Sequence, residues 1–403
     1  MEIYDTIIAM KIYPRSLSLA LAKEIETSRI VVLTGMRQVG KTTLMRQIFN
    51  KIEASNKIFL DFENPLNQKI FEEENFDNII PNLESLGFSL GKKSYIFLDE
   101  VQIMPRIVRA VKYLYDHYKI KFFLTGSSSF YLKNLFPESL AGRKVNYELF
   151  PLNFEEFLVF KEKEKDFLKD FSAKVKKKNK ISFELYKKLF DEYSEFGSFP
   201  AIALEKDRSG KRQILEDIFK SYFEKDIKVL ADFRELGKFR DLILLLANRV
   251  GSKIDISKIS SEIGISRETV YSYLNFLEST YFISLIEPFS KSIDGEVRGA
   301  KKIYFCDSGL LNYLGRIQEG TIFENTVFQN LRKYGNLNYY EKYKGGEIDF
   351  VLNKKFAFEV KSKASVSDLK RLKKFSQNLK LKEYYLIAKD YSELPRTILA
   401  QEL

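Results

Sequence analysis

The chain has 403 residues, and at about 150 residues per domain this length predicts two to three domains. The apolar fraction of 45% is typical of a globular protein, no apolar run reaches the ~18 residues of a membrane span, and the start lacks the pattern of a signal peptide. We therefore expect a cytoplasmic protein without membrane contact. One cysteine and one histidine exclude an intramolecular disulfide and a His/Cys zinc cluster, so any metal should be oxygen-ligated, which favours Mg²⁺. The net charge of +11 favours a polyanionic partner such as DNA, although solvated lysines would give the same excess.

The first predicted strand, residues 31–34, runs into a loop with the pattern G-x-x-x-x-G-K-T and then into a helical pattern. Strand, loop and helix in this order predict a Walker A phosphate-binding loop. We expect Lys41 to reach the β- and γ-phosphates and the Thr42 hydroxyl to bind Mg²⁺. A glycine turn that matches by chance is the alternative. The expected nucleotide-binding residues are Gly35, Met36, Arg37, Gln38, Val39, Gly40, Lys41, Thr42 and Thr43.

A second strand is predicted at 57–61, and the apolar run 93–100 ends in Asp99 and Glu100. A strand that ends in two carboxylates, some sixty residues after a Walker A loop, is typical of a Walker B element. We expect Asp99 to hold Mg²⁺ through its water shell and Glu100 to polarise the attacking water. An ordinary strand end is the alternative.

A helix predicted at 105–118 leads to a further strand, 121–126, which ends in small hydroxyl residues. Ser127, or else Thr125, is the candidate for a polar sensor of the γ-phosphate or the lytic water. Arg143 precedes the next strand and is the candidate for stabilising transition-state charge, in cis or from a neighbouring subunit. A salt bridge at the domain edge is the alternative for Arg143, and Arg37 and Arg106 are weaker candidates for the same role.

Strands alternate with helices over residues 30–150, which predicts the α/β class and a doubly wound parallel sheet of the P-loop NTPase type, with nucleotide at the carboxyl ends of its strands. Several motifs together resemble the prokaryotic AAA-type ATPases that carry a C-terminal domain of unknown function. The resemblance spans nearly the whole chain and implies ATP binding. The motifs are Thr34–Thr43, Leu98–Gln102, Leu124–Ser128, Leu140–Arg143, Phe150–Leu152 and Tyr304–Leu311.

Residues 256–274 have the pattern of a helix-turn-helix, with Gly264 at the turn and Ser266 as the N-cap of the second helix. We expect the start of that helix to expose Arg267, Thr269, Ser272 and Tyr273, and the strands 281–286 and 301–305 to pair as a wing. Such a unit contacts DNA or serves as an inert connector.

Residues 347–352 and 356–361 predict a hairpin whose three-residue loop sets Asp349 opposite Glu359, with Lys361 on the face of Glu359. This resembles the PD-(D/E)xK nuclease core, in which two carboxylates hold Mg²⁺ and the lysine helps activate water. Glu324 matches the acidic residue often found upstream. A structural α/β domain without cleavage is the alternative.

The expected division is an AAA-type core (1–150), a helical lid or connector (151–235), a winged-helix-like domain (236–305) and a nuclease-like domain (306–403). The expected function is that of an ATP-hydrolysing, Mg²⁺-dependent protein whose nucleotide state drives its C-terminal half on DNA or a protein partner. The alternatives are a Mg²⁺-dependent DNA nuclease regulated by ATP and a nucleotide-gated switch with little turnover. The sequence leaves the oligomeric state open.

Overall fold

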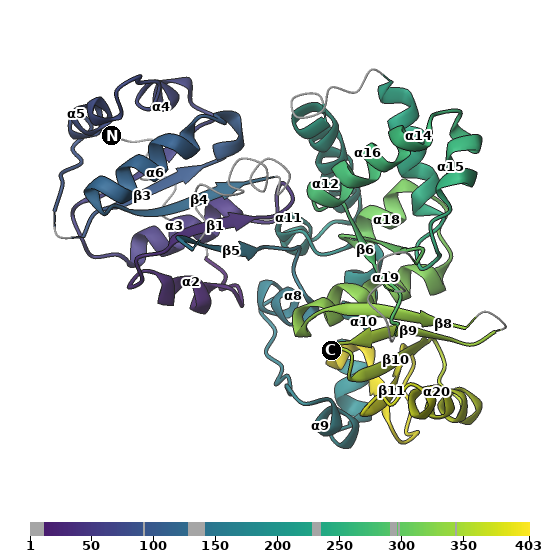
Figure 1. The fold of residues 1–403 in the computed structure, drawn as a ribbon. Helices are drawn as coiled ribbons and strands as arrows, with labels where there is room; N and C mark the ends of the chain where they lie inside the picture. Colours follow the sequence, from purple (N-terminus) through teal and green to yellow (C-terminus); the bar gives the residue numbers. More distant parts are fainter. Residues whose placement is uncertain are drawn as a thin grey trace.

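The computed structural model describes residues 12–91, 93–127, 142–227, 235–290, 296, 299–342 and 345–403. The chain forms an N-terminal lobe and a C-terminal lobe, joined after strand β5 (Figure 1). Some residues of the predicted motifs and domains lie outside the described residues, namely Ser128, Leu140, Ala141 and residues 228–234 of the helical connector.

The N-terminal lobe contains a five-stranded parallel sheet in the order β2-β3-β4-β1-β5, which confirms the predicted parallel sheet. β1 is an interior strand and all its residues are buried, as expected of an apolar β-branched run in a sheet covered on both faces. The strands are β1 (Ile30–Thr34), β2 (Lys57–Asp61), β3 (Tyr95–Asp99), β4 (Lys121–Gly126) and β5 (Lys144–Glu148).

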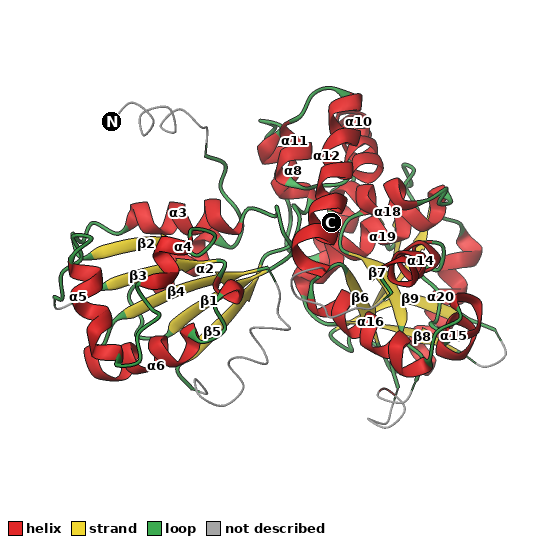
Figure 2. Cartoon of the chain, turned by 90° about the horizontal axis from the view of Figure 1, so that it is seen from above, coloured by secondary structure: helices red, strands yellow, loops and turns green. Residues whose placement is uncertain are grey.

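Two separate apolar cores cover the two faces of this sheet, because successive side chains of a strand point to opposite faces. One face packs on α3 and the other on α5 and α6, and Figure 2 shows α3 and α6 on opposite sides of the strands. The helices of this lobe are α2 (Ser18–Glu24), α3 (Lys41–Lys51), α4 (Pro65–Lys69), η2 (Phe76–Asn78), α5 (Ile79–Glu84), η3 (Val101–Ile103) and α6 (Ile107–Tyr118).

Helices make up most of residues 151–227 of the expected helical connector, 151–235. Its first helix starts at a capping box, in which the side chains of Asn153 and Glu156 each bind the other's backbone N–H. The helices are α8 (Phe154–Phe160), α9 (Phe171–Lys176), α10 (Lys180–Phe196), α11 (Pro200–Leu204), α12 (Arg208–Ser221) and the π-helix η4 (Tyr222–Ile227).

Three helices and a two-stranded sheet follow: α14 (Leu236–Ala247), α15 (Ile256–Ile263), α16 (Arg267–Ser279), β6 (Ile283–Ile286) and β7 (Lys302–Phe305). The predicted turn and cap are present, because Gly264 adopts a left-handed conformation and Ser266 accepts the N–H of Thr269. The predicted pairing of the two strands is also present. The expectation that Tyr273 is exposed is wrong. It is 3% exposed and packs edge-to-face on Phe239, whereas Tyr271 is 61% exposed.

The C-terminal sheet has the order β12-β11-β10-β9-β8. β9 and β10 are antiparallel, with the predicted bounds and three-residue loop, and their register sets Phe358 opposite Phe350 and hence Glu359 in line with Asp349. The remaining elements are α18 (Ser308–Leu314), α19 (Glu319–Leu331), η5 (Arg332–Tyr334), β8 (Leu337–Glu341), β9 (Glu347–Leu352), β10 (Phe356–Lys361), α20 (Val366–Asn378), β11 (Glu383–Ala388), β12 (Thr397–Leu399) and η6 (Ala400–Glu402).

The apolar core on the α3 face continues from the N-terminal lobe into the C-terminal lobe. Met36, which follows β1, belongs to this core, and Thr34 at the end of β1 contacts the second lobe. The Thr34 hydroxyl lies 2.5 Å from the Tyr281 hydroxyl, and Met36 Sδ lies 3.4 Å from Cys306 Sγ. The loop after β1 is therefore supported from behind by the second half of the chain.

Candidate nucleotide-binding site

The loop between β1 and α3 has a backbone that only particular residues allow. Gly35 has φ +154°, and a Cβ there would lie 2.1 Å from the carbonyl oxygen of Leu149. Gly40 has φ +96° and is the N-cap of α3, and among the described residues no side chain caps that helix. The first backbone N–H groups of α3 can therefore donate to an anion, as in a phosphate-binding loop.

Lys41 begins α3 and is 4% exposed. Its Nζ donates to the carbonyl oxygens of Gly35 (3.0 Å) and Met36 (3.1 Å). Burial lowers the pKa of Lys41, while Glu100, Asp226 and Asp99 favour its charged form. The ammonium is held over the loop by contacts that a phosphate can replace.

Two carboxylates, Asp99 and Glu100, stand at the carboxyl end of β3, beside Thr125 of β4. Asp99 ends β3 and is buried, and the Thr125 hydroxyl donates to it. Burial raises the pKa of Asp99, while Thr125 and Thr42 favour its charged form. A buried carboxylate next to a threonine hydroxyl is a set of hard oxygen donors, which fits Mg²⁺. Thr42 and Asp99 are therefore the residues that would hold the metal.

Glu100 follows Asp99 in a left-handed conformation (φ +57°), which is strained for a residue with a side chain. Its N–H donates to Thr125 Oγ1 at 3.1 Å, and its carboxylate accepts from Gln102 Nε2. Burial raises the pKa of Glu100, but the charges of Lys41, Arg37 and Lys225 and the hydrogen bond from Gln102 together outweigh burial, and the net pKa lies below the ordinary value. Glu100 thus stays ionised at neutral pH.

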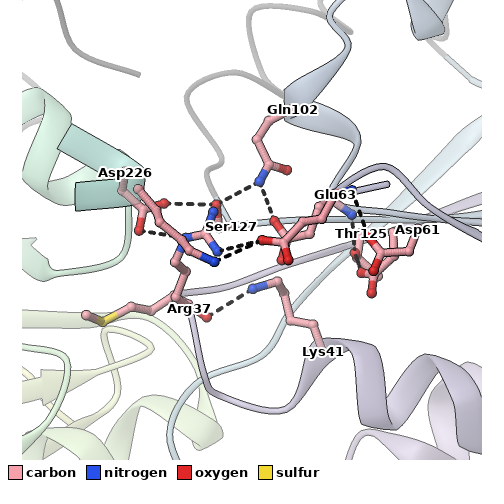
Figure 3. A network of polar contacts seen from close by, with 12 residues as sticks. Arg37, Lys41, Asp61, Glu63, Gln102, Thr125, Ser127 and Asp226 are labelled. Atoms are coloured by element: carbon pink, nitrogen blue, oxygen red, sulfur yellow. Dashed lines mark hydrogen bonds and ion pairs between the residues drawn. The ribbon is translucent and has the colours of Figure 1, made fainter. Parts of the chain in front are cut away.

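A polar network connects the end of β4 with the second lobe (Figure 3). Ser127 Oγ accepts from Gln102 Nε2 at 3.0 Å and donates to Asp226 Oδ1 at 3.0 Å. Asp226 Oδ2 lies 3.0 Å from Arg37 Nε, and Arg37 Nη1 lies 3.5 Å from Glu63 Oε1. The expected sensor residue Ser127 therefore lies in the same network as the P-loop arginine and a carboxylate of η4.

A pocket of about 480 Å³ extends from Lys41, Thr42 and Glu100 towards the second lobe. Its far end is apolar and includes Tyr13 and Phe160, whose stacked rings lie 4.7 Å apart, together with residues of α11. The volume is in the range of small-molecule sites. The pocket thus offers polar groups at the phosphate end and aromatic surface at the other.

Arg143 lies elsewhere. Its backbone carbonyl accepts the N–H of Ile30 at the start of β1, and its Nε lies 3.0 Å from Asp116 Oδ1. Because the P-loop follows the opposite end of β1, the prediction that Arg143 acts on the phosphates in cis is wrong. The alternative, a salt bridge, is present. An action of Arg143 from a neighbouring subunit stays a prediction. Arg106 is exposed at the start of α6.

Sequence reasoning missed three residues of this site. Arg15 donates to the carbonyl oxygens of Val39 (2.8 Å) and Phe150 (2.7 Å) and pairs with buried Glu156 at 3.1 Å. Gln102 and Asp226 were assigned no role. The only signal for Arg15 is indirect, since the Asn-x-x-Glu capping box places Glu156 at a buried helix start, where a carboxylate needs a cation.

A second group of charged residues lies in the C-terminal sheet, and it brings together the predicted nuclease-like residues. Glu359 Oε1 lies 3.0 Å from Lys361 Nζ, and Glu359 also pairs with Arg371. Burial raises the pKa of Asp349, and the charges of Glu324 and Glu359 raise it further. Glu324 accepts from the Tyr304 hydroxyl at 2.7 Å.

Glu359 Oε2 is buried and has no hydrogen-bond partner among the described residues. Within the same part of the chain, no group of three or more His, Cys, Asp or Glu side chains is spaced to hold a metal ion. A metal at Asp349 and Glu359 would thus take further ligands from solvent or phosphate.

Residues 27–158 match the model of an AAA domain. The uncharacterized protein MJ1544 of Methanocaldococcus jannaschii is 31% identical over 371 residues, which cover 88% of this chain and 80% of the relative. The chain belongs to the family of MJ1544. An uncharacterized protein of Haemophilus influenzae is 27% identical, with 82% of this chain and 80% of the relative covered. The AAA-type part of the expected family is supported by the match of residues 27–158 to the AAA domain.

The Walker-type ATPase paby2304 of Pyrococcus abyssi has a similar fold, with a TM-score of 0.50 and 15% identity over 75% of this chain and 96% of that chain. Residues 187–321 and 319–400 of this MJ1544-family chain match two domains of unknown function, DUF8612 and DUF4143. The winged-helix-like and nuclease-like assignments, and the four-part domain division, therefore stay predictions. In the part of the chain that the structure describes, no helix combines the length and apolar character needed to cross a bilayer.

Proposed function

We propose that the protein binds ATP with Mg²⁺ in the pocket between the P-loop and α11 and hydrolyses it. Support comes above all from Glu100, a half-buried carboxylate that lines this pocket together with Lys41 and Thr42 and that the charges of Lys41 and Arg37 help to keep ionised. An ionised carboxylate beside the phosphate end of the pocket is suited to accept a proton from water. The aromatic end of the pocket is suited to a nucleobase.

In the proposed reaction, the phosphates lie on the first amides of α3, and Lys41 and Arg37 neutralise their charge. A water oxygen attacks the γ-phosphorus, Glu100 takes the proton of that water, and the bond between the γ-phosphorus and the bridging oxygen breaks. The products are ADP and inorganic phosphate. Thr42 and Asp99 would hold Mg²⁺, which supplies positive charge to the β- and γ-phosphates when bound.

The test is phosphate release from ATP with Mg²⁺. Loss of the base in Glu100→Gln should lower turnover about 100- to 10,000-fold while ATP still binds, since the substitution keeps the shape of the side chain. Lys41→Ala should weaken ATP binding itself. Turnover at the wild-type rate in either variant would contradict the proposal.

We further propose that nucleotide state drives the C-terminal lobe on DNA. Support comes from the order α14, α15, α16, β6 and β7, which fits a winged helix, and from the isolated antiparallel bridge that Lys253 makes to Lys302 of β7. Arg267 and Ser272 are exposed on the second helix of the pair. Turnover that rises with DNA, more at low salt than at high salt, would support DNA as the partner. Turnover indifferent to DNA would point to a protein partner.

A second candidate function is Mg²⁺-dependent cleavage of DNA by the C-terminal sheet. What favours it is the unpartnered Oε2 of Glu359, in register with Asp349 and beside Lys361. Cutting of plasmid DNA that is lost in Asp349→Ala but kept in Lys41→Ala would support this nuclease, with ATP as a regulator. Tight retention of ATP without phosphate release would instead support a nucleotide-gated switch.

A further inference from the structure

The π-helix η4 places a carboxylate of the C-terminal lobe inside the ATPase site. Asp226 is 2% exposed, and Ser127 Oγ donates to its Oδ1 at 3.0 Å. Its Oδ2 lies 3.0 Å from Arg37 Nε (Figure 3), but neither of these two atoms has an aligned hydrogen-bond partner among the described residues. The ion pair is therefore close but geometrically imperfect.

The partners of Asp226 are groups suited to phosphate. Arg37 lies in the Walker A loop, Ser127 is at the end of β4, and the charge of Lys41 also acts on Asp226. A carboxylate that pairs with an arginine and a serine hydroxyl offers the same charge and acceptor oxygens as a phosphate does. Two such anions compete for one set of donors, because like charges at close range repel each other.

Burying the charged form of Asp226 also costs free energy. Burial raises its pKa to about 6, and the charges of Arg37 and Lys41 only partly offset that cost. Glu100 lies close enough to oppose its ionisation. An incoming anion with greater charge can therefore displace it from these partners without first breaking a strong contact.

Displacement of the Asp226 carboxylate would move parts of the second lobe, because η4 continues α12 without a break. Tyr222, one turn before Asp226, stacks on Phe282 at 4.5 Å, and its hydroxyl lies 2.7 Å from Thr280 Oγ1. Phe282 and Thr280 lie between α16 and β6. Single turns of π-helix are uncommon and occur often at functional sites.

We propose that Asp226 is a sensor of the γ-phosphate: ATP displaces its carboxylate from Arg37 and Ser127 and releases η4, whereas ADP leaves the contact in place. This inference rests on the proposed binding of ATP. It assigns to Asp226 the discrimination between the two nucleotides and to η4 the transmission of that state to α16 and β6. Asp226 is a positioning residue here, since it acts through Arg37 and Ser127.

The test uses the full chain with Mg²⁺ and either ADP or adenosine β,γ-imidotriphosphate, a triphosphate that resists hydrolysis. In the wild type, amide exchange of residues 222–227 should be faster with the triphosphate than with ADP. In Asp226→Asn, affinity for the triphosphate should rise relative to affinity for ADP by at least about fivefold. The same exchange in that variant should no longer depend on the nucleotide.

Lys225→Gln is the matched control, because Lys225 is on the same element and pairs across the lobes with exposed Glu63 at 3.3 Å. It should leave the ratio of the two affinities unchanged. Equal exchange of 222–227 with both nucleotides, or an unchanged ratio in Asp226→Asn, would overturn the inference. Absence of nucleotide binding in the wild type would instead overturn the proposed function, so the two failures are distinguishable.

Discussion

Asp226 carries a buried charge whose energetic cost depends on pH. Its pKa rises from 3.8 to about 6 in the folded chain. Below about pH 4 the carboxyl is protonated in both the folded and the unfolded state, and between pH 4 and 6 only the unfolded state has lost the proton. This group therefore lowers the stability of the folded chain as the pH rises through that window, by up to about 3 kcal/mol above it.

Asp226→Asn removes this titration while keeping the shape of the side chain. We expect the variant's gain in unfolding free energy over the wild type to grow between pH 4 and 6 and to level off above pH 6. Denaturant unfolding of both proteins at a series of pH values measures the difference, in which the other titrating groups largely cancel. A difference that stays constant with pH would contradict the assignment of the burial cost to Asp226.

Arg15 is the second residue whose role depends on burial. It pairs with Glu156 and binds the carbonyl oxygen of Val39 in the P-loop. Burial raises the pKa of Glu156, but Arg15 and the hydrogen bonds from Ser16 together outweigh burial and the net pKa is lowered. Arg15→Met should therefore cost about 3–5 kcal/mol, because it leaves a buried carboxylate without its cation.

Thermal or denaturant unfolding measures this loss. The double variant Arg15→Met with Glu156→Gln is the control, and it should recover part of the stability because no buried charge is left unpaired. If the double variant is less stable than Arg15→Met alone, the effect comes from packing and not from charge.

At the scale of elements, the junction between α10 and α11 depends on one glycine. Gly197 has φ +82°, and a Cβ there would lie 1.9 Å from Asp307 Oδ1. That carboxylate is fixed, because it accepts the N–H of Ser198 at 2.8 Å and the N–H of Leu310 at 2.9 Å. Asp307 thereby caps α18 and ties it to the turn before α11.

Gly197→Ala should destabilise the chain more than Gly87→Ala does. Gly87 has nearly the same φ, +84°, but no described atom lies within 4 Å of its Cβ position. Both variants bear the strain of a side chain at positive φ, about 1–3 kcal/mol, and the strain is greater at Gly197, whose ψ of −163° lies in a region essentially restricted to glycine. Gly197→Ala adds the clash with Asp307, a further ~1–3 kcal/mol or more. Equal melting temperatures of the two variants would show that Asp307 can move away from the added Cβ without loss of stability.

Local patterns in the sequence predicted the elements that local interactions determine. The bounds of β9 and β10, the loop between them and the Walker A loop followed from alternation and from glycine positions. Asp226 and Arg15 were not predictable, because their partners Ser127 and Glu156 lie 99 and 141 residues away in the chain. Tyr273 was misplaced because a helix start alone does not fix which face is buried. The fold of the N-terminal lobe could thus be predicted, but the contacts between lobes could not.

At the scale of the whole molecule, the two faces of the N-terminal sheet belong to different cores. The α3 face shares its core with the C-terminal lobe, whereas the α6 face has a core drawn from residues 30–124. We therefore expect β1 and β7 to unfold as one unit. Native-state hydrogen exchange should give amides 31–33 and 303–305 the same free energy of opening. A lower value for β1 would mean that the first lobe opens by itself.

The chain carries one cysteine, and it lies directly behind the P-loop, 1% exposed and against Met36. Because Cys306 is buried at that contact, a thiol reagent can reach it only when the two lobes part there. Burial also raises the pKa of the thiol, which keeps it unreactive in the closed molecule. The rate at which Cys306 is labelled therefore reports how often the two lobes separate. One labelling rate per nucleotide state would measure how often the molecule opens, without any engineered probe, and we expect that rate to be higher with a triphosphate than with ADP.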